Sequence, residues 1–269
     1  MKQLYFLLFC LTFAACQQPV TETTTINPFN SGKWIDLTHT FDENTIYWPT
    51  AEKFSLDTVS EGETENGYYY SAFQFCAAEH GGTHLDAPVH FARGAWAVEE
   101  IPIEKLVGEV VVLDVSEKAL PNPDYQASVE DLQAWEQAHG TIPDNAILLL
   151  RTGYGKYWPD KKQYMGTDEI GAEAVAKLHF PALHPNAAAW LVNNRKIKAF
   201  GLDTPSIDYG QSKLFETHQT FFKNNIPAFE NVANLSELPT TGSYLMALPM
   251  KIKGGSGGPL RIIAWVPAG

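Results

Sequence analysis

The chain has 269 residues, of which 45% are apolar and 19% are charged, and its formal net charge at pH 7 is -12. This length and apolar content suffice for one large globular domain. The acidic balance argues against a nucleic-acid-binding protein, because such proteins neutralise phosphates with clustered lysine and arginine.

The first sixteen residues, MKQLYFLLFCLTFAAC, have the pattern of a secretory signal whose apolar core is too short to span a bilayer as a mature helix. Alanines directly before Cys16 resemble a bacterial lipoprotein cleavage site. We therefore expect residues 1–16 to be a lipoprotein signal peptide ending at a lipidated Cys16, and residues 17–32 to be a flexible tether. Ordinary cleavage nearby and an uncleaved anchor are the alternatives. The expected location is the bacterial cell envelope, periplasmic or surface-facing, with membrane contact only through the lipid.

The folded part begins at Lys33, and the alternation of apolar and polar residues predicts a first strand at residues 34–38. Residues 57–67 are acidic and rich in turn formers, which predicts a solvated loop. Residues 68–77 favour a strand again, and we expect Cys76 within it to be a buried, small apolar side chain rather than a nucleophile. This strand would lead directly into the next segment.

Residues 80–90, HGGTHLDAPVH, hold three histidines and one aspartate in eleven positions. Imidazole nitrogen and carboxylate oxygen are ligands for divalent metals such as zinc or manganese. His84, Asp86 and His90 have even parity, so an extended segment would present them on one face, whereas two glycines and a proline argue against a regular helix. Unrelated histidines of a polar loop are the alternative. Mixed histidine and carboxylate sets with an open position are typical of catalytic metal sites, which favours an enzyme.

The pattern H-x-G-T-H-x-D-x-P-x-H in this segment resembles the signature of the cyclase family, which includes bacterial kynurenine formamidases and isatin hydrolases. These are metal-dependent enzymes that cleave amide bonds. The resemblance implies that His80, His84 and Asp86 bind metal, with Asp86 able to bridge two ions. It also implies that His90 transfers protons. A Trp-Pro pair similar to the one at Trp48 lies close to the substrate in the family, although packing in the core is an equally good interpretation of Trp48.

Further along the chain, residues 202–208 read LDTPSID and follow a predicted strand. Asp203 and Asp208 can either support a site from behind its ligands or cap the turn. The other segments with buried-strand or amphipathic-helix patterns are strands at 108–115, 146–150 and 197–201 and helices at 128–139 and 186–194.

His218 lies on a predicted helix, and Glu230 follows a break at residues 224–227. Their spacing alone singles out neither residue. Matching positions in the cyclase family imply that His218 completes a second metal site and that Glu230 joins Asp86 as a shared carboxylate.

Two more strands are predicted at residues 244–249 and 260–266, separated by a glycine-rich loop at 254–258. This loop lacks the lysine of a phosphate-binding loop and precedes a strand, so we expect a tight connection near the site. The elements predict an α/β protein with a large mixed sheet and few helices. The resemblance implies that residues 33–269 form a single hydrolase domain with the swivelling β/β/α fold, and that the chain is a homodimer.

The implied activity is a metal-dependent amidohydrolase, arylformamidase-like or acting on cyclic amides, in which metal-activated water cleaves the C–N bond of a small-molecule amide. One or two zinc or manganese ions per chain would serve as the cofactor. A metal-dependent cyclase or dehydratase on the same scaffold is one alternative. A non-catalytic lipoprotein that binds metal or a small ligand is the other.

Overall fold

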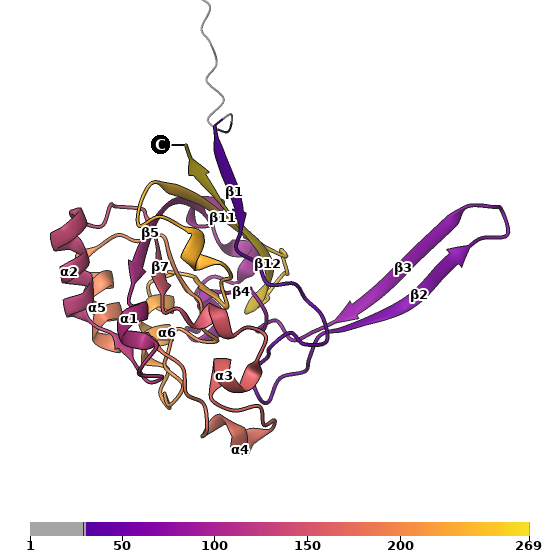
Figure 1. Ribbon diagram of the computed structural model, residues 1–269, viewed down its shortest axis with the longest axis horizontal. Helices are drawn as coiled ribbons and strands as arrows, with labels where there is room; N and C mark the ends of the chain where they lie inside the picture. Colours follow the sequence, from indigo (N-terminus) through magenta and orange to yellow (C-terminus); the bar gives the residue numbers. More distant parts are fainter. Residues whose placement is uncertain (1–28, 30, 269) are drawn as a thin grey trace, which may run out of the picture.

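The computed structural model describes residue 29 and residues 31–268 (Figure 1). The predicted signal peptide, Cys16 and most of the tether lie outside these residues. Within the described part, none of the helices combines the length and the apolar character that a bilayer crossing requires.

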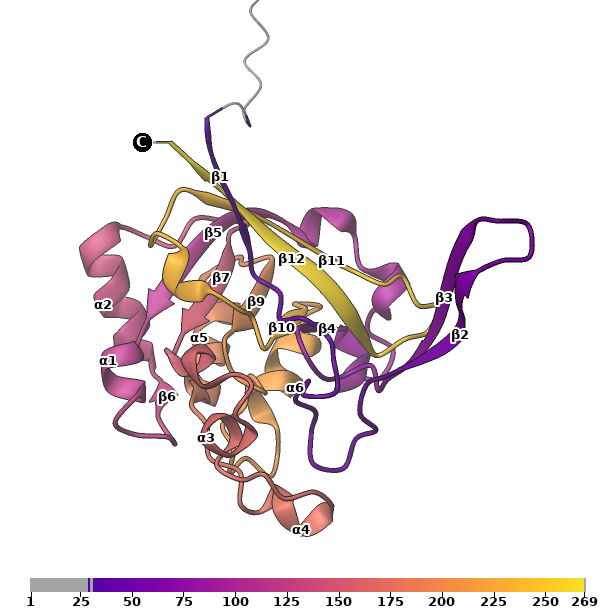
Figure 2. The same ribbon diagram turned by 45° about the vertical axis from the view of Figure 1, so that its right-hand side comes forward.

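A mixed eight-stranded sheet forms the centre of the described chain (Figure 2). Its strand order is β1-β12-β11-β5-β7-β9-β10-β4, and β12 also pairs with β4, so that all strands except β1 close into a barrel. Strands β5, β7, β9 and β10 run parallel, and the other neighbours are antiparallel. The strands of this sheet are β1 Gly32–Asp36, β4 His84–Asp86, β5 Val107–Asp114, β7 Ile147–Arg151, β9 Ala199–Leu202, β10 Ala228–Glu230, β11 Ser243–Pro249 and β12 Gly257–Pro267.

Apolar side chains fill both faces of the parallel strands. Val110 and Val112 of β5 point into the barrel core, while Val111 and Leu113 point into a second core. This is the arrangement expected of a nearly continuous apolar strand. The second core lies under three helices, which are α2 Val129–His139, α5 Pro185–Asn194 and α6 Glu216–Phe222 (Figure 1).

The helix starts and ends follow the sequence signals. Ser128 caps α2 by accepting a hydrogen bond from the backbone N–H of Asp131, and α5 begins with Pro185 in its first turn. The remaining elements are short: α1 Ser116–Ala119, α3 Lys161–Met165, α4 Ala172–Val175, β6 Gln126–Ala127, β8 Ala182–Leu183, and the single-turn helices η1 Pro88–His90, η2 Val98–Glu100, η3 Ile103–Lys105, η4 Tyr154–Tyr157 and η5 Leu235–Glu237. The predicted mixed sheet with few helices is confirmed.

Strands β2 (Ser55–Glu63) and β3 (Tyr69–Cys76) form a separate antiparallel hairpin that projects from the barrel (Figures 1 and 2). We call residues 55–76 the arm. The prediction of a solvated loop at 57–67 is wrong, because most of that stretch is paired with β3. The predicted burial of Cys76 is wrong as well, since its side chain is exposed on a hairpin with no covering layer.

Candidate active site

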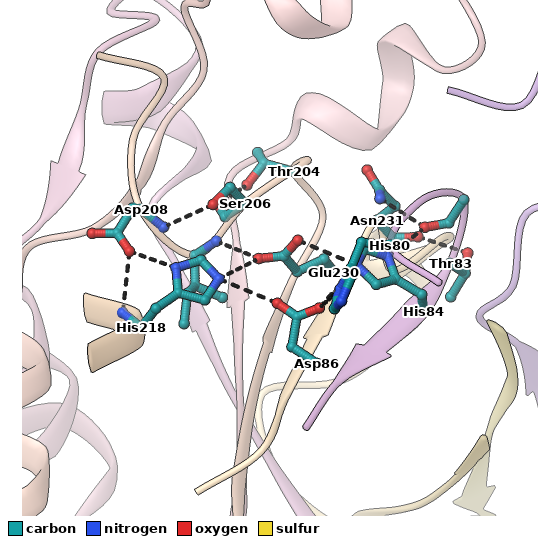
Figure 3. Close-up of polar contacts among 12 residues, drawn as sticks. His80, Thr83, His84, Asp86, Thr204, Ser206, Asp208, His218, Glu230 and Asn231 are labelled. Carbon is teal, nitrogen blue, oxygen red and sulfur yellow. Dashed lines mark hydrogen bonds and ion pairs between the residues drawn. The ribbon is translucent and has the colours of Figure 1, made fainter. Parts of the chain in front are cut away.

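Two segments distant in sequence meet as neighbouring strands at the centre of the site (Figure 3). His84 and Asp86 are two residues apart on β4 and therefore share a face. The antiparallel pairing of β4 with β10 places Glu230 directly opposite His84, on the same face. All three side chains are at most 4% exposed. The pairing of β4 with β10 thus brings Glu230 to the histidine motif.

His80 reaches the same point through the double-glycine turn. A side chain at Gly81 would collide with the ring of Tyr47, and Gly82 has φ +56°, which favours glycine. Asn231 fixes this turn, because its Nδ2 donates to the carbonyl oxygen of Gly82 at 2.7 Å. The turn places Nδ1 of His80 2.6 Å from Oδ1 of Asp86.

His218 enters from α6 on the opposite side. Its Nδ1 donates to Oδ2 of Asp208 at 2.6 Å, and its backbone N–H donates to the same carboxylate. Because a carboxylate only accepts, this contact assigns the proton to Nδ1. The other ring nitrogen, Nε2, lies 3.2 Å from Asp86 Oδ2 and 3.3 Å from Glu230 Oε1.

The other two imidazoles are held in the same way. Nδ1 of His84 donates to the carbonyl oxygen of Gly82 at 3.0 Å. Nε2 of His80 lies 2.9 Å from Oγ of Ser256, whose hydroxyl donates to Glu79 at 2.6 Å, so the Ser256 oxygen accepts from His80. Each neutral ring therefore directs an unprotonated nitrogen toward the carboxylates of Asp86 and Glu230.

This arrangement fits a bound cation. Nε2 of His84 is buried and makes no hydrogen bond, although Asp86 Oδ1 lies 3.0 Å and Glu230 Oε2 3.5 Å away. Facing lone pairs repel unless a proton or a metal ion lies between them. The ligand atoms form two groups, each within 4.8 Å: His80, His84 and Asp86 in one, and Asp86, His218 and Glu230 in the other. Asp86 belongs to both groups.

The pKa values of the clustered side chains also indicate that this site favours positive charge. Burial alone would lower the pKa of His84, but the Asp86 and Glu230 carboxylates raise it to about 9. The pKa of His218 is likewise raised above its usual value, against burial, by its carboxylate neighbours. Burial and the charge of Asp86 raise the pKa of Glu230. The protons that these groups attract occupy the place that a divalent ion would take.

His90 lies beside this centre without joining either ligand group. Its ring stacks on that of His80, with centroids 3.8 Å apart and planes 16° from parallel. Burial lowers the pKa of His90 to about 4, so that the ring is neutral at pH 7. The side chain lines the pocket beside the proposed ligands and is free to exchange a proton there.

A pocket of about 320 Å³ opens above the cluster. Trp48 lines this pocket and also packs edge-on against Phe180. Most of the remaining wall is apolar, a composition typical of small-molecule sites. The lining residues outside the histidine and carboxylate cluster are Ile46, Tyr47, Trp48, Ala51, Ala78, Gly81, Phe91, Pro205, Ser206, Phe215 and Asn231.

A histidine and carboxylate cluster at the floor of an apolar pocket, within a closed mixed sheet, defines a metal-dependent hydrolase. The family model for Cyclase matches residues 35–209, and the chain belongs to this family. It is 30% identical to isatin hydrolase of Roseibium aggregatum over 223 residues, which cover 80% of this chain and 82% of the relative. It is 28% identical to kynurenine formamidase of Bacillus cereus over 236 residues, covering 87% and 97%.

Among solved structures, isatin hydrolase A from Labrenzia aggregata, bound to benzyl benzoate, matches with a TM-score of 0.79 and 33% identity, covering 88% of this chain and 94% of that one. The predicted swivelling β/β/α fold is confirmed, and the predicted metal-dependent amidohydrolase is confirmed as well.

Three residues that contact the candidate ligands did not stand out as site residues in the sequence. Ser256 contacts His80 and donates to Glu79, which directly precedes His80 in the sequence. The glycine-rich loop that holds Ser256 was expected near the site, but no residue within it was singled out. Asp208 was one of two carboxylates after β9 that either support the site or cap the turn. The structure shows that it does both, because it accepts from Thr217 and His218 at the start of α6.

Proposed function

We propose that this chain hydrolyses a small aromatic amide, either a cyclic amide or an N-formyl arylamine. The observation that carries the proposal is the convergence of five ligand-type side chains beneath an aromatic pocket. Rings of Trp48, Phe91 and Phe215 line its wall. These rings suit a flat aromatic group, and the cavity volume of about 320 Å³ matches a molecule of one or two rings. The names of the relatives support the same substrate class.

The proposed cofactor is zinc or manganese, with one or two ions per chain. The ligands would be His80, His84, Asp86, His218 and Glu230, with Asp86 shared between the two groups. Imidazole and carboxylate suit both metals. When bound, the ion supplies a Lewis acid that polarises the substrate carbonyl and lowers the pKa of a water molecule.

His90 is proposed as the proton-transferring residue. Because its ring is neutral at pH 7, it can accept a proton from the attacking water. The resulting imidazolium then returns the proton to the departing nitrogen, which would otherwise leave as an unstable amide anion. Stacking on His80 holds the ring in the pocket throughout.

We further propose that the enzyme is a lipoprotein of the bacterial cell envelope. The support is the signal-like sequence that ends at Cys16, followed by a tether rich in Thr, Asn and Pro. Mass spectrometry of the purified protein tests this. A lipid-modified N-terminal Cys16 is expected, and an unmodified N-terminus retaining Met1 would refute it. We also propose a homodimer, as the family resemblance implies.

The decisive test of the activity is metal removal and return. Apoprotein prepared by chelation should not hydrolyse any member of a panel of formanilides, imides and cyclic aromatic amides. Zinc or manganese should restore hydrolysis of at least one. Incorporation of one ¹⁸O atom from labelled water into the product would distinguish hydrolysis from cyclisation or dehydration. Full activity after complete metal removal would refute the proposal.

A further inference from the structure

We infer that Phe215 is a specificity-determining residue, and that its ring selects substrates with a flat aromatic group. This role rests on the proposed function and deepens it, because it assigns recognition of the aromatic group to one side chain. We call the paired rings of Phe91 and Phe215 the aromatic wall.

Phe215 has a backbone conformation that large side chains rarely adopt. Its φ is +52° and its ψ is +48°, which is the left-handed region. This conformation crowds the Cβ atom of an L-residue against the following carbonyl oxygen, and it is an outlier for a bulky residue. Among the described residues, five residues other than glycine have a positive φ, and the other four are asparagines, which tolerate it well. The backbone at position 215 would therefore favour a different residue type.

Helix α6 does not need a phenylalanine at this position either. Phe215 is the N-cap residue of α6, where a polar side chain usually accepts a hydrogen bond from the first turn, and its side chain accepts none. The carboxylate of Asp208 is the acceptor instead, for the backbone N–H of Thr217 at 3.0 Å and that of His218 at 3.1 Å. Figure 3 shows Asp208 beside His218. The start of the helix therefore does not explain Phe215.

The ring of Phe215 contributes to the pocket instead. It lines the pocket and is only partly buried, so part of its surface is open to a ligand. Its centroid lies 5.3 Å from that of Phe91, with the two planes 38° apart. The Phe91 ring lies 4.5 Å from the ring of His90 and 4.5 Å from that of His218. The aromatic wall therefore begins beside the proposed proton-transferring residue and a proposed ligand.

The aromatic wall favours a flat ring over a puckered ring of the same size. Aromatic rings gain from offset and edge contacts with one another, in addition to the apolar area that they bury. A saturated ring buries a similar area but has no π face. Unfavourable backbone conformations cluster at functional sites, where the side chain serves binding rather than folding. Recognition of a flat ring beside His90 is the contribution that accounts for Phe215.

The experiment compares the dissociation constants of two matched probes, acetanilide and N-cyclohexylacetamide, by calorimetry of the metal-loaded protein. The wild type should bind acetanilide about 3- to 10-fold more tightly, which is the contribution of one aromatic pair. F215L retains an apolar side chain and should bind both probes equally, as should F215N, which suits the left-handed backbone. F215Y retains the ring and should keep the preference. The control L214N, at the exposed neighbouring residue, should keep it as well.

A wild type that binds both probes equally would overturn the inference, as would an F215L variant that keeps the wild-type preference. Loss of the preference in F215Y would overturn it too, because the ring would then not be the selective group. Hydrolysis of formanilide is measured separately. Selective binding of acetanilide without hydrolysis of any amide refutes the proposed function alone, whereas hydrolysis with an unchanged preference in F215L refutes the role of Phe215 alone.

Discussion

The pocket and the arm differ in what they lack. In the pocket, the imidazoles of His80, His84 and His218 each have one nitrogen satisfied by a partner from the same chain, and the second nitrogen faces a carboxylate. This arrangement fits a bound cation. On the arm, hydrogen bonding between β2 and β3 is satisfied, whereas the aromatic face has no covering layer. The comparison teaches that the chain itself orients the polar centre through hydrogen bonds, whereas the side chains of the projecting arm stay largely exposed on the described chain.

The two regions are connected through a row of rings. Phe75 at the base of the arm stacks on Phe54 with centroids 6.2 Å apart, and Phe54 contacts Phe41 at 5.9 Å. The Phe41 ring fills the space that a side chain at Gly82 would need. These rings therefore link the base of the arm to the turn that carries the histidine motif.

The largest effect should come from removing the charge common to both ligand groups. Asp86→Asn keeps the shape but removes the anion that Nδ1 of His80 and Nε2 of His218 face. We expect loss of bound metal and a fall in kcat/KM of more than about a thousandfold, because several kcal/mol of charge stabilisation disappear. Metal analysis and amide hydrolysis measure this. The same substitution on the arm, Asp57→Asn, should leave both quantities unchanged; an active, metal-loaded D86N enzyme would contradict the ligand assignment.

Replacement of the proton-transferring residue should separate chemistry from metal binding. His90→Asn should lower kcat by about 10²- to 10⁴-fold, the usual contribution of a general acid or base, while metal content stays the same. Metal analysis beside steady-state kinetics tests this. Loss of metal in H90N would make His90 a ligand instead.

A smaller effect on metal binding is expected from Asp208, because its carboxylate acts through the imidazole of His218. Asp208→Asn should weaken metal binding by about 10- to 100-fold, because the amide can donate to Nδ1 of His218 and so favour the wrong tautomer. Competition with a chelator measures the affinity. Asp208→Glu retains the acceptor and should recover part of it. An unchanged affinity in D208N would show that His218 needs no such partner.

The apoprotein should also lose stability as the pH rises. The folded pKa of His84 is about 9 and its unfolded value is 6.5, so the stability that its proton contributes is complete below pH 6.5 and is lost as the pH rises through 9. Between these pH values we expect the apoprotein Tm to fall by on the order of 5 °C. The metal-loaded protein should change less, because the ion replaces the proton. Differential scanning calorimetry tests this, and equal pH dependence of the two forms would argue against a cation site.

The sequence revealed the part of the site that is contiguous. Residues 80–90 combine ligand chemistry and backbone signals within one turn and one short strand, so local rules sufficed. His218 and Asp86 are separated by 132 residues, and their contact depends on how β10 and α6 pack around β4. No local pattern encodes that packing, and the family resemblance supplied it.

The arm escaped prediction for the opposite reason. Glycine and acidic residues in 57–67 are poor strand formers by propensity, yet β2 forms because β3 offers it a ladder of partners that is interrupted only by a register shift between Thr58 and Ser60. The buried strands and the capped helix α2 were predictable because their periodicity agrees with their burial.

The most direct test of the central claim is a crystal structure of the metal-loaded enzyme with anomalous differences recorded at the zinc or manganese absorption edge. We expect an anomalous peak within coordination distance of His84 Nε2 and Asp86, and, if a second ion binds, another between His218 and Glu230. A map without a peak among these side chains, from a crystal of enzyme that hydrolyses amides, would contradict the account.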